Sequence, residues 1–151
     1  MANFYAVPGF DPSTPDARYQ PDSIDVAGKV RMMTIKYTTP ASAGPGIGDV
    51  IIWNPNLPKG CRIIPHMTKI YWSTGDASET LTLGDSATAN RYLTATAITT
   101  AGSAVAETGA ASGATYVTGT NSGDTVLSST VAGAALKAAQ VITLHCAYVQ
   151  D

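Results

Sequence analysis

Apolar and polar residues alternate with a period of two along several short stretches of this chain, which is typical of β-strands with one buried face. The densest apolar stretch covers residues 60–84, and its second part places Leu81 and Leu83 on one face and threonines on the other. Small residues at positions 73–76, including Gly75, predict a turn between the two parts. The pattern therefore predicts a hairpin in the middle of a β-sandwich.

Further strands are predicted on both sides of this stretch. They cover residues 31–37, 49–53, 90–98, 114–118, 124–131 and 141–149, while Asn54-Pro55-Asn56 is expected to end the second of them. Pro65 cannot donate to a ladder, so it predicts a bulge or an edge position. The alanine-rich residues 132–140 can form a short turn of helix, although Gly133 disfavours it.

Short strands separated by turn signals favour a sandwich or a jelly roll over a βαβ fold. We therefore predict one all-β domain, a jelly-roll-like β-sandwich, over residues 28–151. Its predicted core consists of Ile35, Ile51, Ile63, Ile70, Leu81, Leu83, Val126, Ile142 and Leu144.

Residues 1–27 have a different character, because they hold four of the nine prolines. Proline fixes φ and removes a backbone donor, which disfavours a place in a sheet. The same segment carries four aromatic residues, Phe4, Tyr5, Phe10 and Tyr19. This combination predicts an extended N-terminal arm that lies across a surface; the alternative is a disordered tail.

Composition adds that the surface is poor in charge. The chain has 151 residues, enough for one domain with a core that needs no disulfides. Charged residues make up 13%, about half of the usual ~25%, and hydrophobic residues make up 44%. Thr, Ser, Asn and backbone groups must supply the polar surface, as in proteins whose surfaces face other protein or in any Thr- and Ala-rich β-protein.

The charge pattern excludes a generally basic nucleic-acid binder, because the net charge is −2 and the nine basic residues are scattered singly. Cys61 and Cys146 form no disulfide framework, and we expect both to be free. No signal-peptide pattern opens the chain, and no apolar run approaches the ~20 residues of a membrane span. We expect a soluble protein made in a cytosol, with no membrane partner.

Candidate chemistry is sparse. The glycine cluster at residues 44–49 lacks the Lys-Ser/Thr of a P-loop. His145 and Cys146 are adjacent on a predicted strand and point to opposite faces, which disfavours a shared metal. No serine sits in a nucleophile elbow. We expect no catalytic, cofactor-binding or metal-binding residue.

Acidic and aromatic residues form two other groups with side chains that occur in binding or catalytic sites. The acids Asp76, Glu79 and Asp85 fall in or beside turns, where such residues are usually solvated turn-formers. The aromatic residues Trp53, Tyr71 and Trp72 can in principle stack on a ligand, but a binder of single-stranded nucleic acid also needs a basic groove. We expect these three to belong to the core.

Five stretches, residues 49–52, 57–60, 81–85, 90–93 and 141–144, occur in an order that resembles small structural proteins of tailed bacteriophages. The proteins in question decorate or cement the phage head. The resemblance covers residues 30–149 and implies an extended N-terminal segment leading into a jelly-roll-like sandwich. It also implies a non-enzymatic virion protein on the capsid surface, made in the host cytoplasm.

The partners implied are the major capsid protein and further copies of this chain, with a trimer favoured. Contacts with capsid or subunit are then expected from Phe4, Tyr5, Phe10 and Tyr19. Two alternatives remain. One is a ligand- or carbohydrate-binding β-sandwich module of a phage tail or receptor-binding protein. The other is an enzyme on a cupin-like jelly roll, disfavoured because two separated histidines cannot supply its clustered ligands.

Overall fold

A computed structural model describes residues 30–42, 44–58, 60–109 and 125–150. Within these ranges the chain forms nine β-strands and one 3-10 helix (η1). Their bounds are β1 Val30–Thr38, β2 Val50–Leu57, β3 Cys61–Ile63, η1 Pro65–Met67, β4 Lys69–Trp72, β5 Thr80–Asp85, β6 Leu93–Ala97, β7 Gly102–Val105, β8 Thr125–Ala132 and β9 Val141–Gln150.

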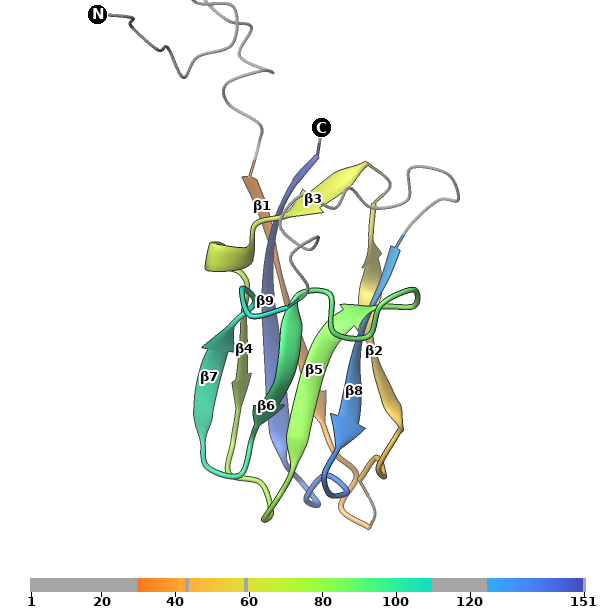
Figure 1. Cartoon of the computed structure of the whole chain (residues 1–151), viewed down its shortest axis with the longest axis vertical. Helices are drawn as coiled ribbons and strands as arrows, with labels where there is room; N and C mark the ends of the chain where they lie inside the picture. Colours follow the sequence, from red (N-terminus) through yellow and green to blue (C-terminus); the bar gives the residue numbers. More distant parts are fainter. Residues whose placement is uncertain (1–29, 43, 59, 110–124, 151) are drawn as a thin grey trace, which may run out of the picture.

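The strands build two antiparallel sheets, which Figure 1 shows stacked on one another. One sheet has the order β1-β9-β4-β7, with β3 also paired to β9; we call it the β9 sheet. The other has the order β2-β8-β5-β6, and we call it the β8 sheet. Strands that follow each other in the chain mostly change sheets, as in a jelly roll. The predicted all-β sandwich is therefore confirmed.

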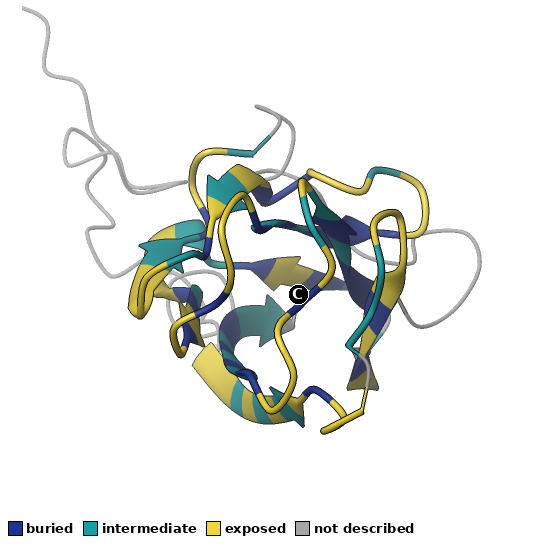
Figure 2. Ribbon diagram, turned by 90° about the horizontal axis from the view of Figure 1, so that it is seen from below, coloured by how far each residue is buried: buried dark blue, intermediate teal, exposed yellow. Residues whose placement is uncertain are grey.

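The hydrophobic core lies between the sheets. Leu83 of β5 and Leu144 of β9 are fully buried, and the neighbouring positions Thr82 and Thr143 are only partly buried. Seven of the nine predicted core residues are buried, whereas Ile35 and Val126 are only partly so. Figure 2 shows the connecting loops mostly exposed and the buried residues along the strands.

The predicted central hairpin is wrong. β4 pairs with β7 and β9, whereas β5 pairs with β6 and β8, so residues 73–79 cross from one sheet to the other. Both strands have one apolar face, and each buries it in the shared core. Two such strands can face each other across a sandwich as well as lie side by side.

Pro65 interrupts the strand, as expected, but as the first residue of η1. A proline at the first helical position loses no hydrogen bond. Ala132 ends β8, and residues 133–140 form bends and turns instead of a helix, with Gly133 and Ala139 at positive φ. β2 continues past its predicted end, and its ladder with β8 shifts register between Trp53 and Leu57. An edge strand tolerates such an irregularity.

β7 was not predicted, because its Gly-Ser-Ala-Val sequence shows no apolar alternation. The predicted strand at residues 114–118 and the N-terminal arm, residues 1–27, lie outside the described residues.

Candidate assembly surface

Exposed apolar residues gather on the first two strands. Each is an edge strand of its sheet, β1 in the β9 sheet and β2 in the β8 sheet. Among the described residues seven large apolar side chains are exposed, and five of them belong to β1, β2 or their connection: Val30, Met32, Ile47, Val50 and Ile52. A long edge strand offers unpaired backbone groups to another chain. These strands are therefore candidates for contact with another protein.

Charge is distributed unevenly between the sheets. The strands of the β9 sheet carry Arg31, Lys36, Arg62 and Lys69 and no acidic residue. The strands of the β8 sheet carry no basic residue and a single acid, the buried Asp85. One side of the sandwich is thus basic although the whole chain is weakly acidic.

Strand pairing brings part of this charge together on the outer face of the β9 sheet. In β1, Met33, Ile35 and Tyr37 pack against the core, so Lys36 lies on the opposite, outer side. Thr143 of β9 pairs with both Lys36 and Tyr71, and its neighbour in the same row, His145, pairs with Lys69. The rings of Tyr71 and His145 are 5.0 Å apart.

We call Val30, Met32, Lys36, Lys69, Tyr71 and His145 the basic face. Apolar, aromatic and basic groups are mixed on it, as at many protein interfaces. Tyr71 is 40% exposed, which corrects its assignment to the core. Among the described residues no acidic side chain pairs with Lys36 or Lys69.

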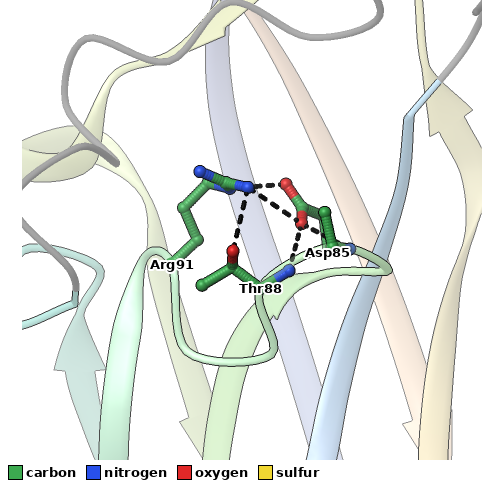
Figure 3. Close-up of polar contacts among 4 residues, drawn as sticks. Asp85, Thr88 and Arg91 are labelled. Atoms are coloured by element: carbon green, nitrogen blue, oxygen red, sulfur yellow. Dashed lines mark hydrogen bonds and ion pairs between the residues drawn. The ribbon is translucent and has the colours of Figure 1, made fainter.

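Asp85 and Arg91 form a buried ion pair between β5 and β6 (Figure 3). Arg91 Nε donates to Asp85 Oδ2 at 2.6 Å, and Asp85 Oδ1 accepts from the backbone N–H groups of Ala87 and Thr88. Asp85 is therefore not the solvated turn residue that the sequence predicted. It fixes the loop between β5 and β6. Both of its carboxylate oxygens accept hydrogen bonds, so Asp85 has a structural role.

Glu79 is also buried, contrary to expectation. Its Oε1 accepts from the backbone N–H of Lys137 at 2.7 Å, whereas its Oε2 and the Oε1 of Gln140 have no partner among the described residues. The carboxylate ties the segment before β5 to the segment before β9. Asp76 is exposed, as predicted.

The two tryptophans belong to the core, as predicted. Trp53 is 1% exposed and Trp72 is 8% exposed. Each buried indole N–H is satisfied, because Trp53 donates to Ser129 Oγ at 2.8 Å and Trp72 donates to the carbonyl of Thr100 at 2.7 Å. Neither ring is available as a stacking platform.

Cys61 and Cys146 are both buried and free, as predicted. Burial raises the pKa of the Cys146 thiol to about 12, the Thr68 hydroxyl opposes the rise, and Cys61 adds to it. A thiol with so high a pKa is a poor nucleophile. The cysteines act as small apolar residues.

The two histidines contact side chains other than the cysteines. His66, in η1, places its Nδ1 2.6 Å from Glu107 Oε2 at the surface. His145 lies against Tyr71. In the part of the chain that the structure describes, no three His, Cys, Asp or Glu residues gather in a group that could hold a metal ion.

The predicted contact residues Phe4, Tyr5, Phe10 and Tyr19 lie outside the described residues, so their role stays a prediction. The basic face was missed. The sequence shows that some predicted strands carry basic residues and others carry none. It does not show which strands pair, so it cannot show that the basic residues share one sheet. No described helix is long and apolar enough to cross a membrane.

Comparison with known proteins shows what fold the chain shares. No known protein family matches it, and no curated protein is similar to it in sequence. A solved structure, the capsid asymmetric unit of cyanophage Pam1, contains a chain that matches with a TM-score of 0.57. The match has 23% sequence identity and covers 82% of this chain and 86% of that chain. The jelly-roll sandwich described above is thus similar in fold to a chain of a phage capsid.

Proposed function

We propose that this protein is a non-enzymatic structural protein of a phage virion that decorates or cements the head. The observation that carries the proposal is the shared fold with a chain of the Pam1 capsid asymmetric unit over most of both chains. The exposed apolar edge strands fit a protein whose task is assembly.

The buried polar groups support a structural role. Asp85 is held by Arg91 and by backbone donors, and Glu79 is held by the Lys137 N–H. The Cys146 thiol is buried. Each of these groups has a structural contact or an apolar environment, although Glu79 Oε2 has no hydrogen-bond partner among the described residues.

In this proposal the protein forms a homo-oligomer, with a trimer favoured, on the outside of the capsid. The N-terminal arm makes part of the contact through Phe4, Tyr5, Phe10 and Tyr19. Aromatic side chains bury a large area at a small cost in rotamer freedom. Many copies on a closed shell add avidity, so each contact can be weak.

The test is binding to heads that were assembled without the protein. The full chain is expected to sediment with such heads and to raise the temperature at which they release DNA. A chain lacking residues 1–27 should bind less and protect less. If the full chain does not bind heads, the decoration role is wrong. Binding to a glycan array instead would favour the carbohydrate-binding module, for which the exposed Tyr71 beside His145 offers a ring surface.

A further inference from the structure

The N-terminal segment that precedes β1 carries the opposite charge to the basic face. Residues 1–29 contain four aspartates, Asp11, Asp16, Asp22 and Asp25, against Arg18 and Lys29, which gives them a net charge of −2. The whole chain also has a net charge of −2, so the remaining residues sum to zero. The excess negative charge of the protein therefore resides in this segment.

The segment divides into two parts by composition. Residues 1–10 have no charged side chain and contain Phe4, Tyr5 and Phe10, whereas residues 11–25 hold all four aspartates and only one basic residue. Fifteen extended residues span about 50 Å. A nine-residue strand such as β1 is about 30 Å long, so the acidic part can cross the whole basic face.

The segment also begins in the right place. It joins β1 at Val30, the first residue of an edge strand of the β9 sheet. Val30 and Met32, next to this junction, are 51% and 57% exposed on the outer side of the sheet. A docked segment would cover these apolar residues and bring carboxylates to Lys36 and Lys69, which have no acidic partner among the described residues.

We propose that the acidic part of the N-terminal segment, residues 11–25, docks on the basic face of a second copy of this chain. The choice of a second copy rests on the proposed function, in which the protein is an oligomer. A segment that passes from each copy to the next is a head-to-tail contact, and such contacts form a ring when the rotation between copies closes and an open filament when it does not. Folding back onto the sheet of the same copy is the alternative occupant, and the isotope experiment below distinguishes the two.

This arrangement leaves residues 1–10 free for another contact. The aromatic part can then bind the capsid while the acidic part joins the copies. The contact between copies is electrostatic in large part, so it weakens as salt rises. Loss of residues 1–27 would lower head binding partly because it removes avidity.

The test uses the full chain in solution without heads, so its outcome is independent of head binding. Light and isotopically heavy protein are mixed in denaturant, refolded together and treated with a carbodiimide, which joins carboxylates to adjacent amines. We expect cross-links from the aspartates of residues 11–25 to Lys36 and Lys69, with light–heavy pairs as frequent as the same-isotope pairs together. Lys137, outside the face, serves as the control amine and should not join these aspartates.

A charge exchange provides the second readout. The double variant Lys36→Glu, Lys69→Glu should sediment as a monomer, and adding Asp16→Lys and Asp22→Lys to it should restore the oligomer. Lys137→Glu, a reversal elsewhere on the surface, should leave the oligomer intact. Circular dichroism confirms that each variant is folded. The proposal is overturned by same-isotope cross-links alone, by the absence of cross-links to Lys36 and Lys69, or by an oligomer that ignores the reversal. Binding of the basic face to a short DNA duplex without light–heavy pairs would likewise overturn it.

Discussion

Leu144 lies on the central strand β9 with its side chain fully buried between the sheets. Replacing it by Ala removes buried methyl groups and leaves a cavity, so we expect Leu144→Ala to lower the free energy of unfolding by about 2–5 kcal/mol. Urea unfolding monitored by tryptophan fluorescence measures the change. The control is Ile52→Ala on β2, since Ile52 is 63% exposed and its truncation should have little effect. Equal effects at both positions would show that the core is not where we place it.

The Asp85–Arg91 pair is buried, so replacing Asp85 removes the carboxylate that binds the Arg91 guanidinium and two backbone N–H groups. We expect Asp85→Ala to lower the free energy of unfolding by about 3–5 kcal/mol. Lys137→Ala is the matched control, because Lys137 meets Asp76 at 3.8 Å on the surface. Such exposed pairs contribute about 0–1 kcal/mol. A similar small loss in both variants, measured by urea unfolding, would contradict the structural role of Asp85.

The raised pKa of the Cys146 thiol makes the stability of the fold depend on pH in the alkaline range. Its pKa is raised from 9.0 to about 12 in the folded chain, so above pH 9 the unfolded chain loses this proton while the folded chain keeps it. The contribution of this thiol to stability is therefore fully present below pH 9 and falls as pH rises from 9 toward 12, by up to about 1.4 kcal/mol per pH unit.

The measurement compares the native chain with Cys146→Ala, because lysines and tyrosines also titrate in this range. The difference in unfolding free energy between the two chains should shrink as pH rises from 8 to 10. A constant difference would mean that the thiol titrates normally. In the same experiment both thiols should react slowly in the folded protein and promptly in denaturant.

For single residues, the sequence predicts burial well when the burial follows from apolar alternation. It predicts burial poorly when the burial depends on a partner that is distant in the sequence. Leu81, Leu83 and Leu144 followed from their spacing. Glu79 and Asp85 did not, because an acid beside a turn is usually solvated. The buried Glu79 carboxylate accepts a hydrogen bond from a residue 58 positions away, and no local sequence pattern reveals this partner.

Among the elements, the connection between β8 and β9 depends on backbone conformation. Gly133 has φ +77°, and a Cβ there would lie 1.8 Å from the carbonyl oxygen of Ser78. We expect Gly133→Ala to be destabilising by more than the ~1 kcal/mol of an αL alanine, since the connection must also move. Thermal unfolding measures it.

Ala139 supplies the opposite control in the same connection. It already has φ +57°, a region that favours glycine, so Ala139→Gly should leave stability unchanged or raise it slightly. A loss at Ala139→Gly as large as at Gly133→Ala would show that the conformation of this segment is not what limits its stability.

The position of strands in the chain was easier to predict than their partners. Apolar alternation located β1, β5 and β9, and these strands were found close to their predicted ranges. It did not distinguish two strands side by side from two strands that face each other, so β4 and β5 were wrongly joined in a hairpin. β7 was missed because glycine, serine and alanine give no alternation, and its pairing with β4 cannot be read from the sequence.

For the whole molecule, the jelly-roll class was predictable and the candidate surface was not. Lys36 and Lys69 are 33 positions apart in the sequence, and only their common neighbour β9 brings them to one face. The predicted contact residues Phe4, Tyr5, Phe10 and Tyr19 precede the described residues. Their role is tested by the truncation experiment on heads, and that of the basic face by the charge exchange.

The location of the protein in the virion is the most direct test of its proposed role. Electron cryomicroscopy can compare heads assembled with and without the protein under the same conditions. We expect density of the size of one sandwich on the outer surface of the shell, grouped in threes, and its complete absence from heads that lack the protein. Identical shells in the two maps would contradict a head-decorating role, and density of this shape on the tail alone would assign the protein to the tail instead.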